Sequence, residues 1–559
     1  MVGSEYFGYN EFMMEAKTQN SPTDDIPTLN AGATRTSTTS QKTGYRIASV
    51  FGRINYNYQM KYLLSLVARY DGISRLKDNR WGFFPGVSVG WNVTEEDFWK
   101  ESKISEVISN IKPRLSYGVN GNVNGIGNFD IYGIYKQIGA GNYDGATAYY
   151  NSSLINTGLR WEQSRSFEAG LDLGFFNNRL SFIFDYYNRT TDDLLTDVNL
   201  PAYTGFSSMK TNLGKLRNSG FEMEVRANIL SNAKGFNWEV SANLTSVSNK
   251  VLKLPTSDKP FNQIDGYEVA AGLYNPETGE TPTKWIGGYR EGGKLGDMIG
   301  YVQNHIFRDW NDVKANANMV IDEVANLYGP GMANEINPQT GVTYAESNGW
   351  KPIEPGDVCW EDINKDGKIN SLDRAVVGNI FPKVTGGFST TLSYKNWSLY
   401  ARFDYALGHT IYNDLKARSL GQYQGQFNII DKVHDTWSET NPDTDLPVFT
   451  YADQLNKKNI TRSNNGNTAV DNNSSRFYEK GDYLALREIT LSYSLPKKWI
   501  GKAGMQDASV YVTGQNLFYI TGYDGVSPEP AVSTVYGRGI DNGRYPTPRT
   551  LLFGLSVTF

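Results

Sequence analysis

The chain has 559 residues, including 56 Gly and 36 Tyr, and its formal net charge at pH 7 is -5. Lys and Arg are scattered along it without forming a basic stripe, so nucleic acid is not an expected partner. The longest aliphatic stretch, "LLSLVA" at 63–68, is far shorter than the roughly 18 apolar residues of a membrane-spanning helix, which excludes a helical membrane protein.

Residues 1–44 are expected to form a loop or a remnant segment before the first clear strand. The opening "MVGSEYFGYNEFMMEAK" has no basic region followed by an apolar run, and therefore does not resemble a secretory signal. If the protein is exported, we expect that its N-terminal part is missing or that the chain begins at an internal Met.

From residue 45 to residue 559, segments with alternating apolar and polar residues predict strands. The first is "YNYQMKYLLSLVARYDG", and the clearest is "SFEAGLDLGFFNNRLSFIFDYYNRT", a predicted hairpin whose turn contains Asn177 and Asn178. The same pattern continues in "GFEMEVRANIL", "FNWEVSANLTSVS" and "GGFSTTLSYKNWSLYARFDYALG". We count about thirteen to fifteen such strands.

These strands carry apolar residues on one face and charged residues on the other. That pattern is typical of an antiparallel transmembrane β-barrel, whose closure leaves no backbone edge unpaired in lipid. A soluble multi-sheet protein such as a surface adhesin remains an alternative. In a barrel, the apolar set is expected to face lipid and the acidic set to face the lumen: Leu171, Leu173, Phe182, Phe184, Phe221 and Val225 against Asp172, Asp185, Glu222 and Glu224.

The longest connection, at about residues 250–382, is too long for a hairpin loop and is expected to be a folded extracellular excursion. Within it, "DINKDGKINSLD" has the spacing of a calcium-binding loop. Oxygen ligands are expected from the side chains at positions 1, 3, 5 and 12 and from the carbonyl at position 7, which are Asp362, Asn364, Asp366, Asp373 and Lys368. A hydrogen-bonded turn without metal is the alternative, since Asp replaces the usual Glu at position 12 and no helical pattern precedes the loop.

No catalytic residue is predicted, and the protein is not expected to be an enzyme. "GVSVG" at 86–90 resembles a nucleophile elbow but lies inside an alternating run with no helix after it. The three histidines have neither zinc-ligand spacing nor a neighbouring Cys. No pattern marks the substrate-binding residues.

Several stretches resemble successive blocks of the SusC/RagA-type TonB-dependent outer-membrane transporters of Bacteroidetes. The blocks follow the family's order from about Tyr45 to Phe559, and they include "NRWGFFPGVSVGWNVTEEDFWK", "IKPRLSYGVNGN", "GDVCWEDINKDGKINSLDRAVVGN", "YLALREITLSYSLP", "GQNLFYITGYDGVSPEP" and "YPTPRTLLFGLSVTF".

This resemblance implies a barrel of ~22 strands closed by a plug domain, located in the outer membrane. It also implies import of glycans or peptides, energy from the TonB complex and a SusD-like surface lipoprotein as partner. Phe559 lies where the family has its terminal aromatic barrel-assembly signal. The chain resembles only the C-terminal part of such a transporter, without the plug. A secreted calcium-dependent binding protein and a plugless porin are the alternative functions.

Overall fold

A computed structural model describes residues 1–133, 135–143, 146–417, 419–420, 430–449, 474–501, 504–529, 539–543 and 545–559. Most of the described residues in regular structure belong to one antiparallel sheet of 14 strands. Its strand order is β1-β2-β3-β4-β5-β8-β9-β10-β11-β22-β23-β26-β27-β29. This agrees with the all-β antiparallel fold and with the number of strands expected from the sequence.

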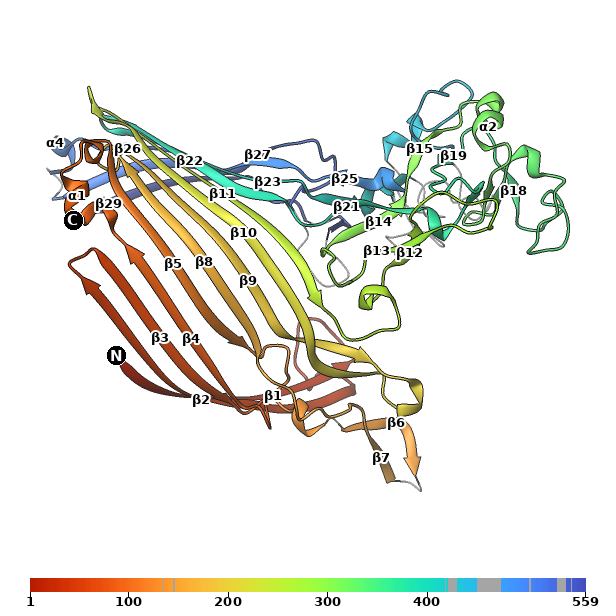
Figure 1. Ribbon diagram of the computed structural model, residues 1–559, viewed down its shortest axis with the longest axis horizontal. Helices are drawn as coiled ribbons and strands as arrows, with labels where there is room; N and C mark the ends of the chain where they lie inside the picture. Colours follow the sequence, from red (N-terminus) through yellow and green to blue (C-terminus); the bar gives the residue numbers. More distant parts are fainter. Residues whose placement is uncertain are drawn as a thin grey trace. The chain divides into compact units, whose positions relative to one another are not determined.

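The strands of this sheet are long, and most neighbours in it are also neighbours along the chain (Figure 1). Their bounds are β1 (Val2–Gln19), β2 (Thr34–Tyr58), β3 (Tyr62–Ile73), β4 (Trp81–Trp91), β5 (Ile108–Asn122), β8 (Glu162–Phe175), β9 (Leu180–Asn199), β10 (Ser208–Ala233), β11 (Phe236–Lys253), β22 (Val384–Tyr394), β23 (Trp397–Leu407), β26 (Tyr483–Ser494), β27 (Asp507–Thr521) and β29 (Thr550–Thr558).

The N-terminus differs from the loop or remnant segment expected over residues 1–44. Val2–Gln19 form β1, which pairs with β2 from Val2 opposite Gly52 to Gln19 opposite Thr34. Alternation is weak in β1 because large apolar residues fall on both faces, for example Tyr6 beside Phe7. The pairing with β2 defines this strand where the residue pattern does not.

Short turns connect the strands at one end of the sheet, and residues with positive φ shape them. In the predicted hairpin between β8 and β9, Asn177 and Asn178 have φ of 55° and 60°. Asparagine tolerates this left-handed conformation better than most residues, so these two positions suit the turn. The turn between β22 and β23 places Lys395 at φ 53°, and the strands then pair from Tyr394 opposite Trp397 onward.

The chain divides into two compact units. The first contains Met1–Asn178, Phe184–Ser219 and Leu252–Thr256, and the second contains Arg179–Ile183, Gly220–Val251 and Ser257–Phe559. In the first unit, a small apolar core under the connections includes Leu76 and Ile126, which are 0% and 1% exposed. The hairpin of β6 (Tyr135–Tyr143) and β7 (Ala146–Asn151) and the helix α1 (Asp97–Lys100) also belong to this unit.

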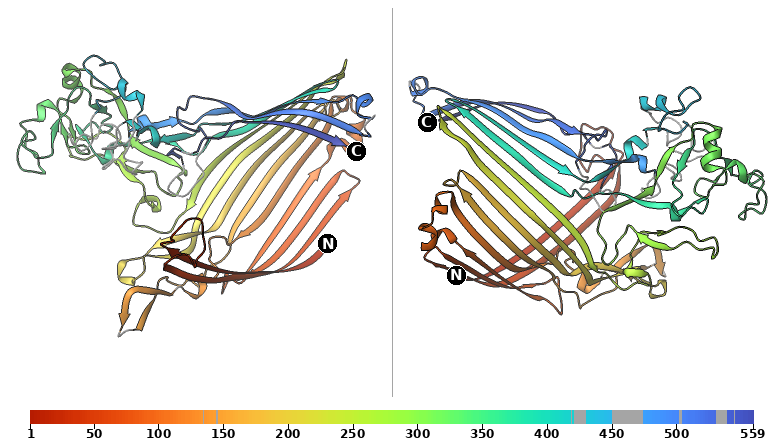
Figure 2. Two further views of the ribbon diagram at one scale, coloured as in Figure 1. Left: turned by 180° about the vertical axis from the view of Figure 1, so that it is seen from behind. Right: turned by 45° about the horizontal axis from the view of Figure 1, so that its top comes forward.

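In the second unit, β22, β23, β26, β27 and β29 follow one another in the sheet, as the cyan to blue ribbons of Figure 2 show. The helices α3 (Asp414–Ala417) and α4 (Lys497–Ile500) are short, and β24 (Thr410–Asn413), β25 (Tyr478–Lys480) and β28 (Ile540–Asp541) form a separate small sheet. Among the described residues, no helix has the length and apolar character needed to cross a membrane.

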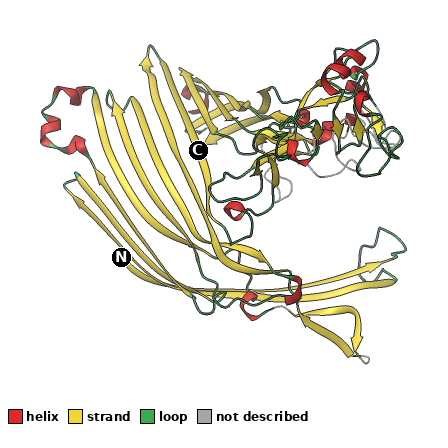
Figure 3. Ribbon diagram, turned by 45° about the vertical axis from the view of Figure 1, so that its right-hand side comes forward, coloured by secondary structure: helices red, strands yellow, loops and turns green. Residues whose placement is uncertain are grey.

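The segment between β11 and β22 is folded, as expected for the excursion at 250–382. It has its own buried clusters, built around Phe307, Tyr301 and Trp350 among others. Figure 3 distinguishes its short strands and helical turns from its loops. Its elements are β12 (Tyr267–Ala270), β13 (Thr283–Ile286), β14 (Asp297–Tyr301), β15 (Gln303–Ile306), α2 (Trp310–Ala317), β16 (Ile321–Asp322), β17 (Leu327–Tyr328), β18 (Lys351–Pro352), β19 (Val358–Trp360), β20 (Lys368–Ile369) and β21 (Arg374–Asn379).

Candidate functional site: the polar face of the sheet and the acidic loop

The first unit's sheet has one apolar face and one polar face. On β5 and β8, the large apolar side chains of Leu115 and Phe167 are 49% and 43% exposed. Ser116 and Glu168 follow them in the sequence, and because successive side chains of a strand point to opposite faces, both lie on the other face. They are directly opposite each other in the pairing of β5 with β8.

An ion-pair group on the polar face connects three strands. Arg114 of β5 donates from Nε to Asp172 Oδ1 of β8 and from Nη2 to Asp185 Oδ2 of β9, both at 2.9 Å. The side chains of Asp172 and Asp185 are 23% and 27% exposed. These two acidic residues of the predicted lumen-facing set therefore share one face of the sheet, as their alternation indicates.

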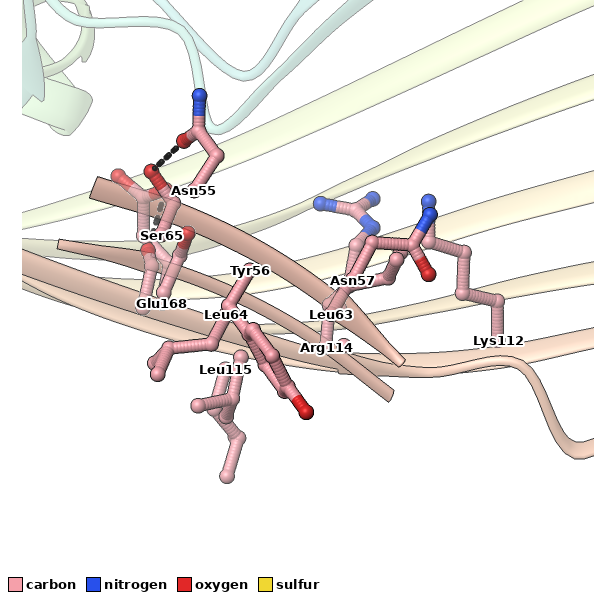
Figure 4. A pocket seen from close by; sticks show the side chains of 15 residues that line it. Asn55, Tyr56, Asn57, Leu63, Leu64, Ser65, Lys112, Arg114, Leu115 and Glu168 are labelled. Carbon is pink, nitrogen blue, oxygen red and sulfur yellow. Dashed lines mark hydrogen bonds between the residues drawn. The ribbon is translucent and has the colours of Figure 1, made fainter. Parts of the chain in front are cut away.

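A hollow of about 440 Å³ lies beside this ion-pair group. Small residues and neutral polar groups line much of it, including Ser65, Ser88 and Gly90, and Lys112 and Glu168 add one charge of each sign. Figure 4 shows Asn57, Lys112 and Arg114 on one side of the strands and Tyr56, Leu64 and Leu115 on the other. No aromatic ring among these labelled residues lies on the side of Lys112.

The acidic loop at residues 362–373 is closed by its own hydrogen bonds. Asp362 Oδ2 accepts from the backbone N of Gly367 at 2.8 Å, and Asp366 Oδ1 accepts from that of Lys368 at 2.7 Å. Asn364, which is 1% exposed, donates from Nδ2 to Asp366 Oδ2. Gly367 has φ of 79°, a conformation that glycine adopts without strain.

Asp373 closes the loop from its far end. Its two carboxylate oxygens accept from the backbone N of Ile363 and of Asn370, at 2.9 and 2.8 Å. The bond to Asn370 is half of a capping box on the helical turn η7 (Ser371–Asp373). Burial raises the pKa of the Asp373 carboxyl to about 6, and the charges of Asp362 and Asp366 act in the same direction.

The geometry of this loop is that of a hydrogen-bonded turn, the alternative to metal binding that the sequence left open. In the part of the chain that the structure describes, no group of three or more His, Cys, Asp or Glu side chains lies close enough together to hold a metal ion. The ion pairs of that part likewise include none with Asp362, Asp366 or Asp373. The three carboxylates are therefore close enough to interact, and no basic side chain neutralises them.

Phe559 follows the last residue of β29, and its side chain is 78% exposed. β29 pairs with β27 from Thr550 opposite Gln515 to Thr558 opposite Asp507. Leu551, Phe553 and Leu555 alternate along the strand and are 65%, 79% and 66% exposed. The chain thus ends on a strand whose apolar side chains are open to the surroundings.

A large antiparallel sheet with an exposed apolar face and an ionic face is the construction of outer-membrane β-barrel proteins. Comparison with known families identifies the kind of barrel. The model of the TonB dependent receptor-like, beta-barrel family matches residues 2–290, and the chain belongs to this family of outer-membrane proteins.

Curated relatives agree with this assignment. TonB-dependent receptor P3 of Formosa agariphila is 31% identical over 542 residues, which are 95% of this chain and 47% of the relative. TonB-dependent receptor SusC of Bacteroides thetaiotaomicron is 30% identical over 531 residues, 93% of this chain and 44% of the relative. The chain thus spans about half the length of the curated relatives it matches.

Among solved structures, the RagAB peptide transporter matches with a TM-score of 0.72 and 23% identity, covering 100% of this chain and 53% of that chain. At this identity the match establishes the fold. These comparisons confirm the resemblance drawn from the sequence, the outer-membrane location and the barrel fold. The family comprises receptors and transporters and not enzymes, which confirms that prediction as well.

Sequence reasoning missed the basic partners of the acidic residues on the polar face. Arg114 contacts two carboxylates that lie 58 and 71 residues further along the chain. The acidic residues themselves were the available signal, because a charge on the half-buried face of a strand needs a partner. Finding that partner requires the strand register, which the sequence does not give.

Proposed function

We propose that the chain forms part of the wall of a TonB-dependent importer that carries glycans or peptides across the outer membrane, together with a SusD-like lipoprotein. The ionic face of the sheet is the observation that carries this proposal. Half-buried pairs such as Arg114 with Asp172 and Asp185 suit a wet interior and would be costly against lipid.

The names of the relatives support the substrate class and the partner. SusC gives its name to the type of transporter, and RagAB is described as a peptide transporter. The hollow beside Arg114 offers hydroxyl, amide and charged groups, which suit hydrogen-bonding nutrients better than lipophilic ones.

The experiment is an uptake assay in the host. Cells that lack the coding region should lose uptake of labelled oligosaccharides or of labelled oligopeptides, and reintroduction of the region should restore it. Loss of TonB energisation should have the same effect as the deletion. Uptake that persists without TonB would instead favour the plugless porin, and unchanged uptake of both substrates in the deletion strain would contradict the proposal.

We further propose that the loop at 362–373 binds Ca²⁺ in a structural role. The side chains of Asp362, Asn364, Asp366 and Asp373 and the carbonyl of Lys368 would supply oxygen ligands. The support is the ligand spacing, the turn at Gly367 and the absence of a basic partner for the three carboxylates within the described residues. Binding would draw these carboxylates closer together than they lie in the structure.

Calorimetry with CaCl₂ tests this second proposal. The protein in detergent should bind Ca²⁺, and the Asp366→Ala variant should lose binding while it keeps its barrel. Glu323→Ala is the control, because Glu323 pairs with Lys368 at 3.9 Å and is not one of the proposed ligands. No heat of binding at millimolar Ca²⁺ would show that the loop is only a turn.

A further inference from the structure

Residues 522–529, which follow β27 and are called the strap here, are held by polar contacts along their length. The carboxylate of Asp524 accepts from Lys416 Nζ at 2.8 Å and from Lys432 Nζ at 2.9 Å. Tyr523 donates its hydroxyl hydrogen to Asp541 Oδ2 at 2.8 Å. The last described residue of the strap, Glu529, reaches the sheet itself.

Glu529 contacts Arg487, which lies on β26. Arg487 donates from Nη2 to Glu529 and to Asp404, the second at 2.9 Å, and from Nη1 to the hydroxyl oxygen of Tyr519 at 2.9 Å. The Tyr519 hydroxyl in turn donates to Glu529 Oε1 at 2.8 Å. The Arg487 side chain is 18% exposed, so its contacts with two carboxylates are largely shielded from water.

A β-bulge aims Arg487 at this position. The pairing of β26 with β27 shifts register between Leu486 and Glu488, which leaves Arg487 as the extra residue. A bulged residue has no direct partner on the neighbouring strand, and its side chain is turned away from the regular alternation. Arg487 can therefore reach Asp404 on β23 and Glu529 in the strap at the same time.

Arg487 also lines a hollow of about 390 Å³ on β11, β22 and β23, a size within the range of small-molecule sites. Its other polar groups include Asn243, Ser389, Arg402 and Asp404. Arg402 has no ion pair within the described residues, although Glu488 is opposite it on β26. The hollow thus has two guanidinium groups, one of which is already bound to the strap.

We propose that this hollow binds a carboxylate group of a ligand, which takes the place of Glu529 on Arg487 and releases the strap. The exchange of one carboxylate for another keeps Arg487 paired, so no buried charge is left alone at either stage. Arg402 provides a second donor group for a ligand that Glu529, fixed to the strap, does not use. The ligand class is a carboxylate-bearing oligomer, which includes both acidic peptides and uronic acid oligosaccharides.

This inference deepens the proposed function by naming anionic substrates, and it rests on that function for the idea that the ligand is transported. Binding and strap release are measured on the purified chain without transport. A failure of uptake and a failure of binding are therefore observed separately.

The experiment measures the affinity of two probes by calorimetry in detergent: acetyl-Ala-Glu-Ala-amide and trigalacturonate, with acetyl-Ala-Gln-Ala-amide and maltotriose as their neutral counterparts. Glu529→Gln removes the competing carboxylate and should lower the Kd of an acidic probe by about tenfold, because a charge-assisted hydrogen bond is lost from the free state alone. Arg487→Gln should abolish binding. Preference for one of the two acidic probes identifies the source of the carboxylate.

Glu224→Gln is the matched control, because Glu224 is also paired with an arginine and its side chain is 35% exposed, against 34% for Glu529. It should leave the Kd unchanged. Hydrogen–deuterium exchange of residues 522–529 should increase when the wild-type chain binds the acidic probe. Weaker or unchanged binding in Glu529→Gln, binding of neither acidic probe, or a strap that stays protected with probe bound would each overturn the proposal.

Discussion

Arg114 and Asp185 form an ion pair directly over Gly170, the residue of β8 that separates their two strands. Their Nη2 and Oδ2 atoms are 2.9 Å apart. A Cβ atom built on Gly170 would lie 2.7 Å from Arg114 Cζ and even closer to Asp185 Oδ1. The missing side chain at Gly170 is therefore what lets the ion pair cross the strand.

We predict that Gly170→Ala destabilises the barrel, because the added methyl group overlaps both members of the pair. The expected cost is about 1 to 3 kcal/mol, the range for overpacking a filled site. The measurement is the unfolding midpoint of the detergent-solubilised protein, read from its heat-modifiable mobility on gels. Gly118→Ala is the control, because the nearest atom to its added Cβ would be 4.0 Å away. Equal midpoints for the two variants would show that the pair does not need this space.

Arginine substitutions on neighbouring positions of β8 should have unequal costs. Phe167→Arg places a charge on the apolar face and should cost about 2 to 4 kcal/mol if it lies near the bilayer midplane. Glu168→Arg, on the polar face, should cost less. Urea unfolding of both variants in lipid vesicles measures the difference, and equal costs would refute the assignment of the apolar face to lipid.

The anchoring of the strap at Asp524 predicts a pH dependence. Burial raises the pKa of this carboxyl, but the hydrogen bonds from Lys416 and Lys432 lower it more, so that it lies well below the usual 3.8. A carboxyl with a depressed folded pKa contributes stability that is fully present above its unfolded pKa and is lost as the pH falls through the folded value.

Asp524→Asn should therefore lower the stability of the strap by a constant amount between pH 7 and pH 5, and the difference from wild type should shrink below pH 3.8. Hydrogen exchange of residues 522–529 as a function of pH measures this. Asp443→Asn is the control, since the Asp443 side chain is 78% exposed and pairs with Arg308 only at 3.4 Å. A difference that is already lost at pH 5 would contradict the assignment.

Deletion of Phe559 should lower the amount of assembled barrel and leave substrate affinity unchanged, if the resemblance to transporters with a terminal aromatic assembly signal holds. Its exposed ring touches no ion pair of the polar face. A version extended to full length with a plug is the appropriate background. Quantifying heat-modifiable protein in outer-membrane fractions, beside substrate binding per folded molecule, separates the two effects. Normal assembly with weakened binding would contradict this role.

The alternation of residues predicted most of this fold because the two faces of each strand meet different surroundings. It gave the hairpin at Asn177 and Asn178, and the faces of Asp172 and Asp185. It failed at β1, where Tyr6 and Phe7 put large rings on both faces and pairing with β2 decides the structure. The spacing of the loop at 362–373 predicted a tight turn, which the φ of Gly367 confirms.

The polar contacts could not be predicted in the same way. The position of Arg487 depends on a β-bulge, and one extra residue in a strand leaves no mark on the residue pattern. Its partner Glu529 lies 42 residues away in the strap. Such contacts are set by register and loop course, which arise only when the strands assemble.

Cysteine labelling in intact outer membranes tests the central claim, that the polar face lines an aqueous path and the apolar face meets lipid. Ser116 and Leu115 are adjacent on β5 and point to opposite faces, so each serves as the control for the other. With the single native Cys359 replaced by Ser, Ser116→Cys should react with a charged, membrane-impermeant maleimide and Leu115→Cys should not. Equal labelling at the two positions, or labelling only at Leu115→Cys, would contradict the account.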